Sequence, residues 1–254
     1  MRQETRLPHT FVASPNFGPR KNNLKPTILL LHYTGMETAA KACDWLCRPE
    51  SNVSCHYLVD EAGAITQMVD ERMRAWHAGE GSWGGQEDIN SMSIGIEIQN
   101  TGHTGEYEPF PDQQMKAVVA LCRDIVERHG IRPECVLAHS DIAPARKIDP
   151  GEKFDWGQLY RAGIGHWVEP AAISGGQALQ FGDSGDKVTA MQGMFALYGY
   201  GLQPTGNFDL ATKQVVEAFQ RHFRPARVDG VADQSTIETL FKLTAALPGY
   251  SGTS

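Results

Sequence analysis

Two histidines and an aspartate stand at positions in this sequence from which they could bind one metal ion. His32 follows an apolar segment, His139 follows a second one, and Asp149 lies ten residues beyond His139. Imidazole nitrogens and carboxylate oxygens are donors that suit a divalent cation such as Zn²⁺. Three protein ligands leave a fourth position for water or substrate, which is the arrangement of a catalytic zinc site rather than a structural one.

Such a site would allow hydrolysis without a serine or cysteine nucleophile. Bound zinc lowers the pKa of water towards neutrality and polarises the carbonyl group of an amide. Spacing alone leaves a second interpretation open, because nine histidines offer many triplets. A histidine at the end of a strand is more often simply hydrogen-bonded.

Short strands and amphipathic helices that could position these residues alternate along the first part of the chain. The apolar segment 27–31 predicts a buried strand that ends before His32. A helix capped by Asp112 is expected, with Gly130 just past its end, and another is expected to start at Thr38 and stop before Pro49. Interspersed strands and helices predict an α/β layer fold around a central sheet. Further strands are predicted at residues 56–59, 65–69, 94–98 and 136–138.

The C-terminal part has a different pattern. Residues 169–178 are small and aperiodic, which predicts a linker between a first domain, 1–168, and a second, 179–254. Within the second, a Gly-Asp-Thr pattern repeats with an offset of 24 residues, and each Asp is suited to cap a helix. With an earlier helix, these predict a three-helix module that binds rather than catalyses. The two copies are Gly206, Asp209 and Thr212, then Gly230, Asp233 and Thr236.

Charge and composition limit the kinds of binding partner and the cellular compartment that we expect. Lys and Arg number 23 against 30 Asp and Glu, a net charge of −7, so there is no basic field to attract nucleic acid. The first twenty residues contain neither a secretory apolar segment nor a membrane span. The sequence as written predicts a cytoplasmic protein, with a periplasmic one as the alternative if a signal segment has been removed. A monomer is expected.

The five cysteines are few and odd in number, which favours buried reduced thiols over a disulfide framework. Cys43 and Cys47 lie one helical turn apart and could form half of a metal site. No second pair of cysteines or histidines completes such a site, so packing in the core is the favoured interpretation.

Five motifs follow one another along the first domain: LHYTG at 31–35, SCHYL at 54–58, RAWHAG at 74–79, SIGIEI at 93–98 and AHSDIAPARKIDPG at 138–151. In order and spacing they resemble the motifs of the type-2 N-acetylmuramoyl-L-alanine amidases. The resemblance covers roughly residues 25–168 and is strongest to the branch called AmiD, with AmpD as near kin. It implies a central mixed sheet flanked by helices, and a zinc ion held by His32, His139 and Asp149.

The resemblance also implies that Glu97 and Lys147 flank the attacked carbonyl group. Glu97 lies in an apolar strand, where an unpaired carboxylate is costly, so it needs a partner or a cleft. It could act as general base, or be a structural carboxylate paired with an arginine. Lys147 precedes Asp149 by two residues, which places both side chains on one side of an extended segment. It could stabilise the oxyanion, or be a solvated lysine of a loop.

Three residues of the RAWHAG motif are candidates for substrate binding. A peptide that carries carboxylates needs a local cation because the whole chain is negative, and Arg74 is the candidate for this contact. The resemblance places Trp76 along the cleft and both His56 and His77 beside the site. These two histidines are expected to have structural or substrate-positioning roles, outside the metal set, and His77 is the third candidate for substrate binding.

The C-terminal segments GNFD at 206–209, AFQ at 218–220 and DGVAD at 229–233 resemble the three-helix peptidoglycan-binding domain. Sugar binding is what this resemblance implies. The alternative is a module that packs against the catalytic domain and shapes one wall of its cleft.

The implied activity is hydrolysis of the amide bond between N-acetylmuramic acid and L-alanine in peptidoglycan fragments, anhydro-muropeptides included. Two alternatives remain at this point. One is a peptidoglycan recognition protein without catalysis, although such members tend to lose a metal ligand. The other is a zinc peptidase that cuts within the stem peptide.

Overall fold

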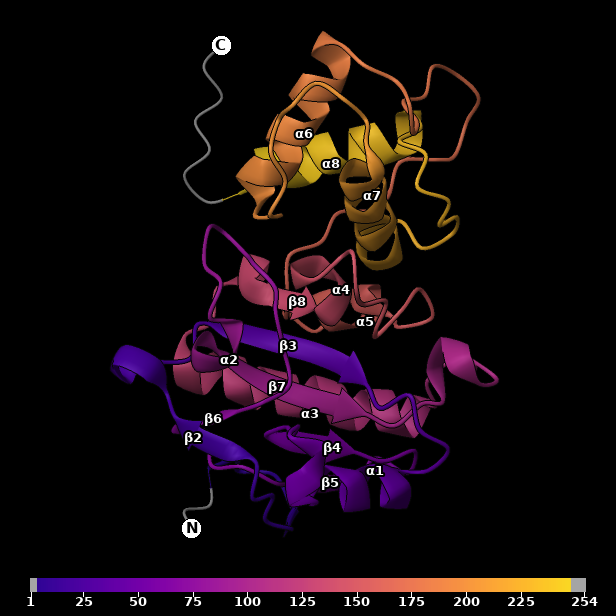
Figure 1. The fold of residues 1–254 in the computed structure, drawn as a ribbon. Helices are drawn as coiled ribbons and strands as arrows, with labels where there is room; N and C mark the ends of the chain where they lie inside the picture. The colour runs from indigo at the N-terminus through magenta and orange to yellow at the C-terminus, as the bar shows by residue number, and fades with distance from the viewer. Residues whose placement is uncertain (1–3, 248–254) are drawn as a thin grey trace.

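The computed structural model, which describes residues 4–247, places a six-stranded mixed sheet at the centre of the N-terminal part (Figure 1). The strand order is β1-β5-β4-β7-β3-β8, and β4, β7, β3 and β8 are parallel neighbours whereas β5 is antiparallel to β4. This confirms the predicted fold class. The strands are β1 (Thr10–Phe11), β3 (Ile28–Tyr33), β4 (Tyr57–Val59), β5 (Ile65–Gln67), β7 (Ser93–Ile98) and β8 (Val136–Ala138).

Helix α3 (Asp112–His129) packs against the sheet through the apolar face that its periodicity predicts. Burial of each large apolar side chain contributes roughly 1.5–3 kcal/mol. The helix ends at Gly130 with φ 64°, as expected, but Asp112 is its first helical residue and Pro111 takes the capping position. Five of its side chains in the core are Met115, Val118, Leu121, Cys122 and Ile125.

The remaining elements differ from the predictions mainly at their ends. Strand β3 extends to Tyr33, so His32 lies within the strand and not after it. Thr38, the predicted start of the next helix, is its N-cap and accepts a hydrogen bond from the backbone N–H of Lys41 at 3.2 Å. The other elements are β2 (Phe17–Pro19), β6 (Met73–Ala75), α1 (Ala39–Leu46), α2 (Ile89–Met92), α4 (His139–Ile142) and α5 (Trp156–Arg161), with 3₁₀ turns at Lys21–Asn23, Pro49–Ser51, Gly102–Thr104 and Pro133–Cys135.

Three helices, α6 (Asp186–Tyr198), α7 (Leu210–Phe223) and α8 (Gln234–Ala245), form the C-terminal unit beyond β8 and α4 (Figure 1). The predicted caps are confirmed, because Asp209 accepts from the N–H of Thr212 at 2.9 Å and Asp233 from that of Thr236 at 2.8 Å. One continuous core includes both the sheet and these helices. The division at 169–178 stays a prediction.

All five cysteines are free thiols. Cys55, Cys122 and Cys135 are buried, as predicted, whereas Cys43 and Cys47 are half-buried. Among residues 4–247, no helix is both long and apolar enough to cross a membrane.

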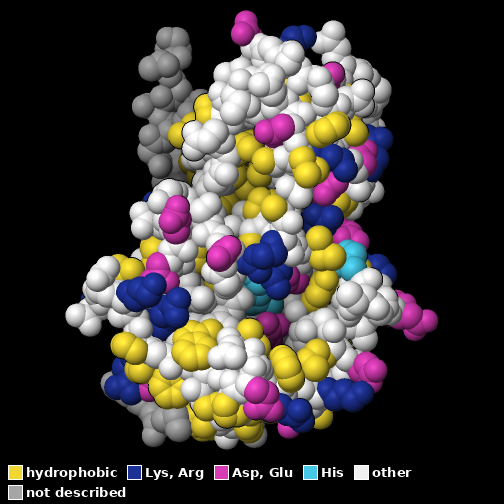
Figure 2. All heavy atoms as spheres, viewed as in Figure 1, with side chains coloured by type: hydrophobic (Ala, Val, Ile, Leu, Met, Phe, Trp, Pro, Cys, Tyr) yellow, Lys and Arg dark blue, Asp and Glu magenta, His cyan; other side chains and the backbone are white. Residues whose placement is uncertain are grey.

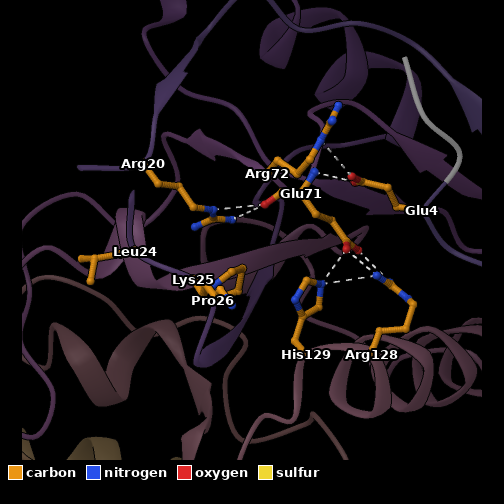
Figure 3. A pocket seen from close by; sticks show the side chains of 9 residues that line it. All are labelled: Glu4, Arg20, Leu24, Lys25, Pro26, Glu71, Arg72, Arg128 and His129. Carbon is orange, nitrogen blue, oxygen red and sulfur yellow. Dashed lines mark hydrogen bonds and ion pairs between the residues drawn. The ribbon is translucent and has the colours of Figure 1, made fainter. Parts of the chain in front are cut away.

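A buried carboxylate ties α3 to the sheet. Glu71 is 2% exposed and accepts hydrogen bonds from the hydroxyl of Tyr57 at 2.6 Å, from Arg128 Nη2 at 2.7 Å and from His129 Nε2 at 2.7 Å (Figure 3). Its carbonyl oxygen accepts from the guanidinium group of Arg20 at 2.7 Å. The cavity beside this network measures about 620 Å³. Because its carboxylates are already paired, we assign the network to stability.

Glu71 makes stability depend on pH. Burial alone would raise the pKa of this carboxyl group, but the hydrogen bonds from Arg128, His129 and Tyr57 outweigh burial and lower the pKa from 4.5 to about 2. A depressed pKa stabilises the folded state above the unfolded value, and this contribution is lost as the pH falls from about 4.5 towards 2.

We therefore expect Glu71→Gln to lower the free energy of unfolding at pH 7 by about 3 kcal/mol. The difference from wild type should shrink to less than half of that at pH 3, as measured by urea unfolding. Glu127→Gln, at an exposed position of α3, serves as control and should match wild type. A difference that is independent of pH would contradict this account.

Candidate active site

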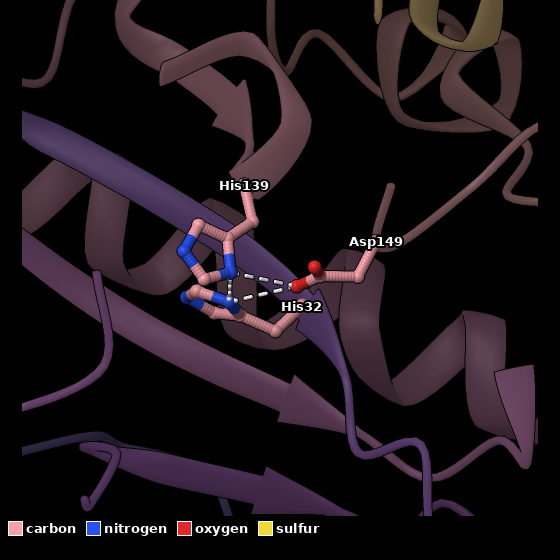
Figure 4. A group of neighbouring side chains, drawn as sticks. All are labelled: His32, His139 and Asp149. Carbon is pink, nitrogen blue, oxygen red and sulfur yellow. Dashed lines mark hydrogen bonds and ion pairs between the residues drawn. The ribbon is translucent and has the colours of Figure 1, made fainter. Parts of the chain in front are cut away.

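Three donor atoms converge at the edge of the sheet where β3 and β8 end (Figure 4). His32 Nδ1 lies 2.9 Å from His139 Nδ1 and 3.0 Å from Asp149 Oδ2, and His139 Nδ1 lies 2.9 Å from the same oxygen. His139 is the first residue of α4, and the backbone N–H of Ser140 donates to the carbonyl of Asp149 at 3.1 Å. All three side chains are buried.

The Nε2 atom of each imidazole, which faces away from the three converging atoms, is hydrogen-bonded to a neighbouring residue, and this fixes the orientation of both rings. His32 Nε2 lies 3.0 Å from His77 Nδ1, and His139 Nε2 donates to the carbonyl of Ala78 at 2.9 Å. His77 Nε2 donates in turn to Ser93 Oγ at 3.2 Å, whose hydroxyl donates to a backbone carbonyl. This chain makes His32 the donor and His77 the acceptor, so the Nδ1 lone pairs of His32 and His139 point at one another.

This donor set fits a divalent transition metal. Donor atoms that lie about 2.1 Å from a common ion are roughly 3.0–3.4 Å apart, close to the separations found here. Burial, then the charge of His139, lower the pKa of His32 to about 4, so this imidazole is neutral at pH 7. Burial would raise the pKa of Asp149, but His139 and His32 lower it well below its usual range. Neutral imidazole and ionised carboxylate are the ligating forms.

A glycine on β7 makes room for the ring of His77, the hydrogen-bond partner of His32. A side chain at Gly95 would overlap the ring of His77. His77 was expected to contact substrate; it lines the pocket beside the metal ligands, but its two ring nitrogens bind His32 and Ser93. We assign it to holding His32.

Glu97 reaches the same pocket from β7, where it is paired in register with His32 of β3. Its Oε2 is buried and has no hydrogen-bond partner among the residues that the structure describes. Burial, and then the negative charge of Asp149, raise the pKa of Glu97 well above its usual value, while Lys147 acts in the opposite direction. No arginine pairs with this carboxylate within residues 4–247, which disfavours the structural alternative.

Lys147 lines the pocket together with Asp149, consistent with side chains two residues apart. The pocket measures about 250 Å³, and Figure 2 shows histidine side chains at the floor of a hollow with basic and acidic side chains around it. Part of the lining is apolar, and no sequence motif predicted it. It consists of Met36, Ala42, Trp45, Leu46 and Val53.

The other two predicted substrate contacts lie outside this pocket. Arg74, on β6, pairs with Asp88 at 3.4 Å. The backbone N–H of Trp76 donates to Ser54 Oγ at 2.9 Å. Neither lines the pocket, so substrate binding by these two residues stays a prediction.

A mixed sheet flanked by helices, with a buried His-His-Asp centre at its edge, defines a class of metal-site hydrolases. The family model for N-acetylmuramoyl-L-alanine amidase matches residues 22–152, and the model for a putative peptidoglycan binding domain matches residues 184–240. The chain belongs to the N-acetylmuramoyl-L-alanine amidase family. The predicted enzyme class is thereby confirmed, and a recognition protein without catalysis is disfavoured.

Two relatives show the extent of this similarity. The N-acetylmuramoyl-L-alanine amidase AmiD of Escherichia coli is 35% identical over 82% of this chain and 79% of its own. A solved structure of E. coli AmiD with the substrate anhydro-N-acetylmuramic acid-L-Ala-D-gamma-Glu-L-Lys covers 91% of both chains with a TM-score of 0.73. AmpDh3 of Pseudomonas aeruginosa is 30% identical, with a TM-score of 0.70 over 91% of this chain and 94% of its own.

A shorter amidase of the family matches a smaller part of this chain. The 1,6-anhydro-N-acetylmuramyl-L-alanine amidase AmpD of Enterobacter cloacae is 31% identical over 87% of its own length but only 59% of this chain.

The arrangement of His77 leads to a prediction about metal affinity. Outer partners of metal-bound histidines typically contribute a factor of 10–100 to affinity, so His77→Phe should weaken binding of Zn²⁺ or Co²⁺ by about that factor. His77→Asn, which keeps an acceptor near the Nδ1 position, should recover part of it. Competition with a chelating dye measures both.

His166→Asn, at a half-buried histidine hydrogen-bonded to Tyr198, is the control and should keep wild-type metal affinity. Unchanged affinity in His77→Phe would show that His32 needs no such support.

Proposed function

We propose that this amidase is zinc-dependent and hydrolyses the bond between N-acetylmuramic acid and L-alanine in soluble peptidoglycan fragments. The convergence of His32 Nδ1, His139 Nδ1 and Asp149 Oδ2 within 3.0 Å carries the proposal. When bound, zinc supplies a water of lowered pKa and polarises the scissile carbonyl group. Two histidines and a carboxylate with an open fourth position are a ligand set of catalytic zinc sites.

Glu97 is the proposed general base. Its buried Oε2 has no hydrogen-bond partner among the described residues, and the side chain lines the same pocket as His32 and Asp149. From there it can accept a proton from the attacking water and pass it to the departing amine of L-alanine. Burial and the negative charge of Asp149 raise the pKa of Glu97, which strengthens it as a proton acceptor.

Lys147 is the proposed oxyanion partner. It has no carboxylate partner among the ion pairs of the described residues, and it lines the same pocket. A cation aimed at the place where charge develops stabilises the transition state more than the ground state.

Muropeptides are the proposed substrates. The solved structures of relatives with anhydro-N-acetylmuramic acid-L-Ala-D-gamma-Glu-L-Lys and with anhydromuramic pentapeptide support this choice. Because the motifs and the similarity concern this amide, we favour it over a bond within the stem peptide. The cytoplasmic location stays a prediction.

Metal removal tests the cofactor directly. Treatment with 1,10-phenanthroline should abolish release of the stem peptide from a defined anhydro-muropeptide, and added Zn²⁺ should restore it. Mass spectrometry of the products identifies the bond that is cut, and atomic absorption measures the metal. A metal-free preparation that still releases the peptide would overturn zinc dependence.

Replacement of the base tests the proton transfer separately. Glu97→Gln should lower kcat by about 10²–10⁴-fold, the usual contribution of a positioned acid–base group, while zinc content stays near one per chain. Glu50→Gln, at an exposed position next to α1, is the matched control and should keep full activity. Near-normal turnover in Glu97→Gln would assign the base elsewhere.

A further inference from the structure

The two units meet at one buried carboxylate beside the metal site. Asp141 lies on α4, two residues after His139, and has no exposed surface. Its Oδ1 accepts from the hydroxyl of Tyr200 at 2.8 Å, and its Oδ2 accepts from His222 Nδ1 at 2.7 Å. Its third donor is the backbone N–H of Ala138 at 2.8 Å.

Tyr200 and His222 both belong to the C-terminal unit. A buried carboxylate without hydrogen bonds is strongly unfavourable, and the backbone N–H of Ala138 alone could not satisfy Asp141. The N-terminal unit of this chain therefore buries a charged group whose side-chain partners come from the other unit.

Both partners are held rigidly. The ring of His222 stacks on Trp156 of α5 with centroids 3.7 Å apart. The ring of Tyr200 packs edge-on against Trp83 at 5.0 Å. A backbone hydrogen bond also connects the two units, because the N–H of Gly84 donates to the carbonyl of Gly199 at 2.8 Å. These contacts join the same two units as the bonds to Asp141, and they fix the orientation of both donor rings at the junction.

The carboxylate of Asp141 is connected to two metal ligands through the short helix α4. Its bond to the N–H of Ala138 closes the turn that begins with His139. The N–H of Ser140 in the same turn donates to the carbonyl of Asp149 at 3.1 Å, and the other end of α4 accepts from the N–H of Ser82 at 2.8 Å. A displacement of Asp141 would therefore move the backbone that aims His139 and Asp149.

We propose that Tyr200 and His222 are positioning residues for the metal site, acting through Asp141. The inference rests on the proposed zinc site. It makes the C-terminal unit part of the catalytic scaffold of this chain. This dependence is not a requirement of the chemistry, because the E. cloacae AmpD, named as an amidase, matches only 59% of this chain.

Full-length variants test the inference. Tyr200→Phe removes one hydroxyl group, His222→Leu removes the ring donor, and His222→Asn keeps a side-chain N–H near the position of Nδ1. Tyr198→Phe is the matched control, because it removes another buried junction hydroxyl, which bonds to His166 at 2.9 Å and not to Asp141. For each, we would measure Zn²⁺ affinity against a chelating dye, the visible spectrum of the Co²⁺ form, kcat and KM, and urea unfolding.

Tyr200→Phe and His222→Leu should weaken Zn²⁺ binding about tenfold, change the Co²⁺ spectrum and lower kcat with little change in KM. His222→Asn should recover most of the affinity, and Tyr198→Phe should keep the wild-type spectrum. If His222→Leu does not fold, the Zn²⁺ affinity and the Co²⁺ spectrum of Tyr200→Phe test the proposal on their own.

Two results would overturn the proposal in distinguishable ways. Wild-type affinity and spectrum in Tyr200→Phe and His222→Leu, with only unfolding affected, would leave the zinc site intact and reduce the junction to a structural contact. A wild-type protein without affinity for Zn²⁺ would remove the proposed function itself, and this inference with it.

Discussion

Two imidazole nitrogens and a carboxylate oxygen face one another within 3.0 Å in a buried part of this protein. With their outer nitrogens serving as donors to His77 and Ala78, the two Nδ1 atoms present lone pairs to each other and to the carboxylate. Negative and electron-rich atoms in a region of low dielectric repel one another, and a cation relieves that repulsion. The surrounding fold has to keep these donors together, and much of its architecture can be understood from this requirement.

The sheet topology explains why part of this centre could be predicted from the sequence. Strands β3 and β8 are parallel neighbours, with Leu31 opposite Ala138, so the residues that follow these two positions meet at one edge. His32 and His139 could therefore be paired from the apolar segments before them, although His32 is still within its strand. Asp149 follows no strand, and only the motif around it identified it as a ligand.

Other parts of the site depend on contacts that no local pattern contains. Arg74 is a plausible cation in the sequence, but Asp88, 14 residues further on, pairs with it in the structure. His77 supports His32 only because β7 carries a glycine beneath its ring. Likewise, the C-terminal repeat predicts its own helix caps, yet it does not show that Tyr200 reaches Asp141 across 59 residues. Caps and apolar periodicity are short-range features, whereas these interactions are set by tertiary packing.

The pocket is large enough for the bond that is cut but too small for the whole substrate. A cavity of about 250 Å³ is smaller than the 300–1,000 Å³ typical of pockets that enclose a drug-sized ligand. It can hold the scissile amide with the adjoining methyl groups, which the apolar lining around Trp45 and Met36 suits, but not a sugar with its stem peptide. The remainder of a muropeptide must lie on the surface around the opening. Because the chain carries a net charge of −7, the carboxylates of the peptide depend there on individual cations. In the proposed function, the rigid centre therefore selects the bond, and the surface around it selects the sugar form and the peptide length.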